Sequence, residues 1–431
     1  MPKFGGGLLF QRMRGERPPG GAIPAIDLER LRADLAAVNL IGTLEGQPGI
    51  NRVSFSDADM AARGWLRRRM EEAGLSSRMD EAGNVFGRWE EGEGPAVLAG
   101  SHLDTVPNGG PLDGSLGVLA ALEGVRTLRE AGWRPSRPIE VVCTADEEGR
   151  FGGMLGSEAI TGALEPEWVQ TARDENGIPL TAALREQGLD PDHLRAAARD
   201  PSEFSAFVEI HVEQGPVLER AGASVGIVDV VSGCFHWQVT LAGEANHSGS
   251  TPMDLRRDAF RGLASFGEGI DAILASAGTA EAKLTVGKVR LEPNFPHTIA
   301  GTAVFSLIGR DVEEAGMLRL AEACRSWLDR VAREHRLEVS LRELSWLAPV
   351  FLDAGLAELL REEAGRLGLS FRTLPSGGGH DAQTFASVTR SGLIFVPSVG
   401  GVSHAPEEWT EWADIERGAN LLTAALARLA G

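Results

Sequence analysis

The sequence predicts an α/β protein of two domains, in which a compact βαββαβ domain is inserted into a larger one. Three observations support this prediction. The chain has 431 residues, which exceeds the length at which a single hydrophobic core usually stops growing. Its first part alternates amphipathic helical stretches with short apolar runs, as α/β proteins do. Between residues 235 and 344 the order of periodic segments changes to that of a split βαβ unit.

The elements of the larger domain follow from the spacing of apolar residues. Helical spacing spans 57–73 and 116–131, and short apolar runs occupy 96–99 and 139–144. The run at 139–144 is bounded by Pro138 and a polar turn, which is typical of a buried strand. Polar residues that follow such a strand lie at the edge of the sheet where clefts form.

The inserted domain is predicted from six consecutive segments, which are strand 235–241, helix 254–275, strand 283–291, strand 302–309, helix 312–335 and strand 337–341. We therefore divide the chain into three parts. These are an N-terminal arm at 1–25, a catalytic domain at 26–232 and 345–431, and an inserted domain at 233–344.

Composition excludes several classes of function. The 42 basic and 61 acidic residues give a formal charge of −19, whereas nucleic-acid binding needs clustered Lys and Arg, so we predict no nucleic-acid partner. The cysteines Cys143, Cys234 and Cys324 are far apart, which argues against disulfides and a thiolate metal site. Because we find no signal-peptide pattern and no apolar run near the ~18 residues of a membrane span, we expect a cytoplasmic protein without a membrane partner.

Polar motifs follow the predicted strands of the first half. His102 and Asp104 form an HxD pair after the apolar run 96–99, on one side of an extended backbone. There the carboxylate can orient a metal-binding imidazole, while a histidine satisfied within a loop is the alternative. The consecutive acids 146–148 follow strand 139–144, and such like charges repel unless cations lie nearby. A solvated acidic turn is the alternative there.

Three further residues complete a possible set of metal ligands. Asp113 precedes a helix, where its alternative role is that of an N-cap. His211 and His404 each follow an apolar run. Together with His102 and Glu148 they supply the N and O donors that two zinc-type ions need if one carboxylate bridges them. We expect two divalent ions per chain, Zn²⁺ by preference, with Mn²⁺, Co²⁺ or Ni²⁺ as alternatives.

The motifs also occur in a characteristic order, HLD, DG, EEG, EIHVEQG, ANHSGSTPMDLR, GGGHDA and SHAPEE. In this order the chain resembles the N-carbamoyl-L-amino acid hydrolase, allantoate amidohydrolase and β-ureidopropionase group of co-catalytic dizinc amidohydrolases, relatives of aminoacylase in one metallopeptidase superfamily. The resemblance spans about residue 26 to the C-terminus. It implies a zinc-peptidase-like catalytic domain, a ferredoxin-like inserted domain that serves as lid and dimerisation surface, and therefore a homodimer.

The resemblance further implies a role for each site residue. Asp113 would bridge the metals, with His102 and His211 on one ion and with Glu148 and His404 on the other. Glu147 would be the general base, and Asp104 would be the partner of His102. The remaining implied residues contact the substrate or line its cleft, and they are Gln214, His247, Asn294, Arg310 and His380. Of these, His247 would also stabilise the oxyanion.

The implied reaction is hydrolysis of the ureido C–N bond of an N-carbamoyl-L-amino acid to the amino acid, CO₂ and ammonia. The substrate is thus a small ureido compound whose carboxylate pairs with Arg310. Allantoate amidohydrolase and β-ureidopropionase are the first alternatives, followed by aminoacylase or dipeptidase. A non-catalytic binding protein would have lost the base or a ligand, and none is missing. The family strand commonly reads Asp-Ile-Arg, whereas this chain has Ile308-Gly309-Arg310.

Overall fold

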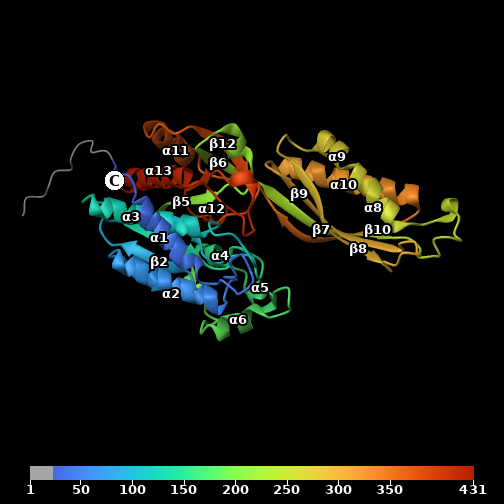
Figure 1. The fold of residues 1–431 in the computed structure, drawn as a ribbon, viewed down its shortest axis with the longest axis horizontal. Helices are drawn as coiled ribbons and strands as arrows, with labels where there is room; N and C mark the ends of the chain where they lie inside the picture. The colour runs from blue at the N-terminus through green and yellow to red at the C-terminus, as the bar shows by residue number, and fades with distance from the viewer. Residues whose placement is uncertain (1–22) are drawn as a thin grey trace, which may run out of the picture.

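The computed structural model describes residues 23–431, so the predicted arm at 1–25 lies almost entirely outside the described residues. The described chain contains two separate β-sheets, each with its own hydrophobic cluster (Figure 1). The strands of the larger sheet are β1 (Ser76–Met79), β2 (Val85–Trp89), β3 (Ala96–His102), β4 (Ile139–Thr144), β5 (Phe204–Val212), β6 (Val225–Val231), β11 (Val350–Phe351), β12 (Phe371–Ser376) and β13 (Ser391–Val396). This mixed α/β architecture confirms the predicted fold class.

The larger sheet has the strand order β1-β2-β4-β3-β5-β13-β6-β11, with β12 paired to β6. Its centre is parallel, because β3 pairs in parallel with β4 and β5, and β13 pairs in parallel with β5. The strands β1, β2 and β11 are antiparallel to their neighbours. The carboxyl ends of β4, β3, β5 and β13 therefore lie side by side at one edge of the sheet.

Helices cover both faces of the larger sheet. Alternation along β5 shows this, since Val208 and Ile210 belong to one apolar cluster and Phe207 to the other. The first cluster receives α1 (Leu28–Asn39), α2 (Asp57–Glu72), α3 (Ser115–Glu130), α11 (Ala354–Arg366) and α13 (Trp412–Ala430), and the second receives α4 (Leu155–Thr161), α7 (Val217–Ala221) and α12 (Asp381–Phe385). A side cluster holds α5 (Pro166–Thr171), α6 (Leu180–Glu186) and η1 (Leu194–Ala197), next to η2 (Pro201–Glu203). No helix within 23–431 has the length and apolarity needed to cross a bilayer.

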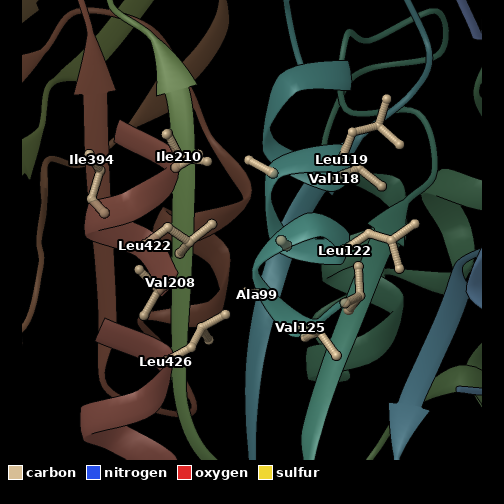
Figure 2. Close-up of a cluster of buried hydrophobic side chains, with 14 of the residues drawn as sticks. Ala99, Val118, Leu119, Leu122, Val125, Val208, Ile210, Ile394, Leu422 and Leu426 are labelled. Atoms are coloured by element: carbon tan, nitrogen blue, oxygen red, sulfur yellow. The ribbon is translucent and has the colours of Figure 1, made fainter. Parts of the chain in front are cut away.

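The packing of α3 and α13 fixes the parallel core of the sheet. Figure 2 shows Leu422 and Leu426 of α13 beside Val208 and Ile210 of β5. Each of these side chains is fully buried, which stabilises the fold by about 1.5–3 kcal/mol per residue. A Cβ at Gly117 of α3 would lie 2.6 Å from the carbonyl oxygen of Ile210. Glycine at this position therefore lets the start of α3 approach the strands that carry the site.

The second sheet has the order β10-β7-β9-β8, built from β7 (Gly233–Ala242), β8 (Lys283–Glu292), β9 (Thr302–Asp311) and β10 (Glu338–Leu347). The helices α8 (Ala259–Glu268), α9 (Ile270–Ala277) and α10 (Glu314–His335) cover one face. The order of elements agrees with βαββαβ. The strand β10 ends at Leu347, so the second sheet extends beyond the predicted boundary at 344.

The prediction of one continuous helix at 254–275 was wrong. The structure has a 3₁₀ turn, η3 (Met253–Leu255), followed by the separate helices α8 and α9. Asp258 caps α8 by accepting the N–H of Phe260, and Gly269 separates α8 from α9. A Cβ at Gly269 would lie 2.1 Å from the ring of Trp327 on α10. Only glycine therefore fits at position 269, which separates the two helices.

Candidate functional site

The predicted polar residues gather at the carboxyl edge of the four central parallel strands. His102 ends β3 and lies opposite Thr144, which ends β4. His211 is the penultimate residue of β5 and lies opposite Phe395 of β13. The loops that continue from β4 and β13 carry residues 146–148 and His404. Ligands in open α/β sheets bind outside this edge, so the topology explains why motifs far apart in sequence meet.

One cluster consists of His102, Asp113 and His211, all of which are buried. Oδ1 of Asp113 lies 3.0 Å from Nε2 of His211 and 3.4 Å from Nε2 of His102. Nδ1 of His211 lies 2.9 Å from the carbonyl oxygen of Val212, an arrangement that leaves Nε2 to face Asp113. Two imidazoles and one carboxylate oxygen thus converge on a single point.

A second cluster consists of Asp113, Glu148 and His404. Here the other oxygen of Asp113, Oδ2, lies 3.4 Å from Nε2 of His404. Oε2 of Glu148 lies 3.3 Å from the same nitrogen. The two oxygens of Asp113 therefore face different clusters, which is the geometry that a carboxylate bridging two cations requires.

The donors fit divalent cations by their chemistry and by their lack of other partners. Nε2 of His102 and Oε1 of Glu148 are buried and have no hydrogen-bond partner within residues 23–431, a situation that costs free energy unless a ligand satisfies them. Burial and the nearby Asp113 raise the pKa of Glu148 to about 7. Burial opposes the charged form of His211, but Asp113 outweighs it and raises the pKa of that imidazole to about 9. A bound cation would stabilise the ionised form of these buried carboxylates.

Glu147 and Glu148 point toward opposite clusters although they are adjacent. Oε2 of Glu147 lies 3.4 Å from Nε2 of His102, whereas Glu148 faces His404. The preceding Asp146 has φ 54°, a left-handed conformation that is costly for a residue with a Cβ and that often marks functional sites. Burial raises the pKa of Glu147 well above its usual range, and Asp381 and Glu148 add to the shift against the opposing effect of His102.

Asp104 contacts residues of both clusters. Its Oδ2 accepts hydrogen bonds from Ser54 Oγ at 2.8 Å and from the Glu148 N–H at 3.1 Å. Nδ1 of His102 lies 2.9 Å from the backbone carbonyl oxygen of Asp104 and 3.8 Å from its carboxylate. The imidazole is therefore oriented chiefly by the Asp104 backbone. The buried guanidinium of Arg63 lies 3.8 Å from the Asp104 carboxylate and partly balances its charge.

Gln214 and His380 also lie at the clusters. Gln214 Nε2 donates to Oδ2 of Asp113 at 2.8 Å, and its backbone is left-handed with φ 59°. The ring of His380 packs against that of His211 with centroids 4.6 Å apart, and its Nε2 lies 2.9 Å from Ser376 Oγ. Burial and the neighbouring His211 hold the pKa of His380 well below its usual range. Both effects favour the neutral form of His380.

The structure does not bring His247, Asn294 or Arg310 into contact with these clusters. Within residues 23–431, no hydrogen bond, ion pair or ring contact joins them to the metal-ligand candidates. His247 and Asn294 lie on exposed loops of the second sheet, where Asn294 and Phe295 help to line a hollow of about 380 Å³. Arg310 lies near the end of β9, opposite Cys234 of β7. All three residues belong to the inserted part of the chain.

Two residues at the site were not predicted from the sequence. Glu408 is 1 % exposed and accepts hydrogen bonds from the loop that carries Asp113. Ser403 lies 3.2 Å from Oδ2 of Asp113 and 2.6 Å from Glu408. Both occur in the SHAPEE segment, but a pair of glutamates after proline resembles a solvated turn, so only their position in the fold reveals them.

Comparison with known proteins agrees with this geometry. Residues 98–428 match the model of Peptidase family M20/M25/M40. The chain is 40 % identical over 390 residues to an N-carbamoyl-L-amino acid amidohydrolase from Geobacillus stearothermophilus, covering 89 % of this chain and 94 % of the relative. It is 35 % identical to an allantoate amidohydrolase from Bacillus subtilis, covering 89 % and 93 % of the two chains. A solved amidase of the hydantoinase/carbamoylase family from Burkholderia multivorans is 33 % identical with a TM-score of 0.86, over 94 % of this chain and 98 % of that one.

Proposed function

This chain belongs to peptidase family M20/M25/M40 and to its group of N-carbamoyl-L-amino acid and allantoate amidohydrolases, and from this membership we propose that it hydrolyses the ureido C–N bond of an N-carbamoyl-L-amino acid. The products are the amino acid, CO₂ and ammonia. The observation that carries the proposal is the pair of donor clusters that share Asp113, with Glu147 beside them.

The two clusters would hold two divalent cations, with Asp113 between them. We propose Zn²⁺, because imidazole and carboxylate donors at a site open to water suit it. His102 and His211 would hold one ion, and Glu148 and His404 the other. When bound, the cations supply an acidified water and polarise the substrate carbonyl.

Glu147 is the proposed general base. It would accept the proton of the attacking water and return it to the leaving nitrogen as the C–N bond breaks. Its burial supports this role, because a carboxylate withdrawn from water holds a proton more readily. Asp104 would keep His102 and the backbone of Glu148 in place during the reaction, since it contacts both.

The inserted part of the chain would bind the rest of the substrate. We propose that Arg310 pairs with the substrate carboxylate and that His247 and Asn294 contact the ureido end, together with Gln214 and His380 of the larger domain. Because the first three are apart from the clusters in this structure, the proposal requires that an inserted domain approach the site during turnover, as lids do. The domain boundary at 232/233 remains part of this proposal, whereas we propose the second boundary after Leu347, where β10 ends.

We also propose a homodimer that forms through the inserted domain in the cytoplasm. Five large apolar side chains between residues 233 and 344 of that domain are more than half exposed, and they are Met253, Leu255, Phe260, Phe295 and Leu318. Apolar surface of this kind is typical of protein interfaces. Light scattering coupled to gel filtration would test the dimer, and charged substitutions at these positions should yield monomers.

A substrate screen tests the proposed activity. Ammonia release should be measured with N-carbamoyl-L-amino acids, allantoate and β-ureidopropionate, using Glu147→Gln prepared in parallel to measure contaminating activity. We expect the highest kcat/KM with an N-carbamoyl-L-amino acid. Allantoate hydrolysis is the second candidate because an allantoate amidohydrolase is 35 % identical to this chain, and a clear preference for allantoate would overturn the first assignment.

A further inference from the structure

A buried carboxylate outside the proposed ligand set joins the two loops on which that set depends. Oε1 of Glu408 accepts hydrogen bonds from the backbone N–H groups of Leu112 at 3.0 Å and of Asp113 at 2.8 Å. Its Oε2 accepts one from Ser403 Oγ at 2.6 Å. Glu408 thus links the loop of Asp113 to the loop of His404, which are nearly 300 residues apart in sequence.

Both oxygens of Glu408 are committed to these bonds, so this carboxylate is not free to bind a cation itself. It is 1 % exposed, and burying a carboxylate is costly unless hydrogen bonds compensate for the lost water. The loops are also closely fitted around it, since a Cβ at Gly110 would lie 2.4 Å from Oε1 of Glu408. The side chain therefore has one well-defined position, and it sets the spacing of the two loops.

His404 needs such an anchor more than the other ligand candidates do. Its side chain is 50 % exposed, whereas that of His102 is 1 % exposed and that of His211 is 2 % exposed. It lies on a loop rather than a strand, and its φ of 53° is left-handed. A strained and exposed ligand holds its position only if the surrounding structure fixes it.

Ser403 connects the anchor to the bridging carboxylate. Its single hydroxyl proton lies between two acceptors, Oε2 of Glu408 at 2.6 Å and Oδ2 of Asp113 at 3.2 Å. The shorter distance assigns the proton to Glu408. Oδ2 of Asp113 is thereby left without the Ser403 proton, and it accepts a hydrogen bond from Gln214 Nε2 at 2.8 Å.

We propose that Glu408 is a positioning residue that presets the distance between Asp113 and His404 and so determines affinity for the ion held by Asp113, Glu148 and His404. The inference rests on the paired metal site of the proposed function but not on the identity of the substrate. Partners that orient metal ligands typically contribute about 10- to 100-fold in affinity. Glu408 should act selectively on one of the two ions.

The test compares stepwise Zn²⁺ affinities of the full-length chain by competition with a chromophoric chelator. In Glu408→Gln, the new amide NH₂ replaces Oε2 and faces Ser403, whose proton then turns toward Asp113. We expect the affinity for the ion held by Asp113, Glu148 and His404 to fall about 10-fold in this variant and about 100-fold in Glu408→Ala. The affinity for the other ion should change by less than about threefold, because its ligands His102 and His211 lie on strands β3 and β5. Ser403→Ala should weaken the same ion by less than Glu408→Ala.

A control is Glu123→Gln. Glu123 is fully buried and, like Glu408, accepts a backbone N–H and a hydroxyl, from Asp27 and Thr127. It also pairs with the guanidinium of Arg30 at 2.7 Å, and it joins α1 to α3 away from the clusters. Both glutamine variants should lower the melting temperature of the metal-free protein. Only Glu408→Gln should change a metal affinity.

Equal metal affinities in Glu408→Gln and wild type would overturn the proposal, and so would equal losses at both ions. If Glu408→Ala does not fold, the glutamine and Ser403→Ala variants still decide the question. A wild-type protein that binds two ions but hydrolyses no ureido substrate would refute the proposed function and leave this inference intact. A protein that binds only one ion would refute both.

Discussion

Replacing Glu147 with glutamine should abolish turnover while both ions stay bound, whereas Glu148→Gln should release one ion. The two side chains point to opposite clusters, because Oε2 of Glu147 lies 3.4 Å from Nε2 of His102 and Oε2 of Glu148 lies 3.3 Å from Nε2 of His404. Asp146, just before them and after the end of β4, has a left-handed backbone. Adjacent glutamates in this turn therefore cannot share one role.

The expected loss in Glu147→Gln follows from its chemistry. Glutamine has nearly the same shape but accepts no proton, and a general base typically contributes about 10²- to 10⁴-fold, or roughly 3–5.5 kcal/mol of the barrier. Glu147 is buried, and its pKa lies well above the usual range. We therefore expect a loss near the upper end of that range.

Metal content after gel filtration, measured by mass spectrometry, separates the two roles, and single-turnover ammonia release measures the chemical step. Glu147→Gln should retain wild-type metal content. If it loses an ion while Glu148→Gln keeps both, the two roles are reversed. If both variants keep two ions and full activity, Glu147 is not the general base and Glu148 is not a metal ligand. The roles inferred from the two clusters are then refuted.

Four further predictions concern the ions, the substrate and the core. Saturation with Zn²⁺ or Mn²⁺ and removal of the excess should leave two ions per chain by elemental analysis, and a maximum of one would exclude a paired site. Zinc binding at pH 7 should release at least one proton, because the metal-free His211 has a pKa of about 9 and must lose its proton to bind. Calorimetry in buffers of different ionisation enthalpy measures the number of protons released. Arg310→Leu should lower kcat/KM by roughly 30-fold to several thousand-fold, equivalent to about 2–5 kcal/mol, and should remove discrimination against the carboxamide analogue. Leu422→Ala, at a fully buried position, should destabilise the fold by about 2–5 kcal/mol in urea unfolding.

Elements with strong periodicity were predictable from the sequence. The run at 139–144 is β4. The stretches at 57–73 and 116–131 match α2 and α3, with each boundary differing by at most one residue. Each has a buried face made by nearby residues, so local pattern and final packing agree. The packing of Gly269 was not predictable, because the ring of Trp327 that excludes a Cβ there approaches from a distant helix.

The metal-ligand candidates were predictable for a topological reason. Each one lies in or just after an apolar run or ahead of a helix, and a parallel sheet carries such positions to the same edge. Glu408 follows no such rule. Its significance depends on contact with Leu112 and Asp113 across nearly the whole chain, and nothing in the local sequence indicates that contact. The same holds for the buried Arg63 beside Asp104.

The charge of the site argues for two cations rather than one. Four carboxylates, those of Asp104, Asp113, Glu147 and Glu148, are at most 9 % exposed, and charges buried this deeply must be compensated. In the metal-free chain the histidines supply this charge, which is why the pKa of His211 rises to about 9. Ligation requires neutral imidazoles, so binding removes that compensation. One divalent ion would balance less of this buried negative charge than two ions would. A second ion would therefore contribute to the stability of the site as well as to its chemistry, and a residue that determines the affinity for that ion would act on both.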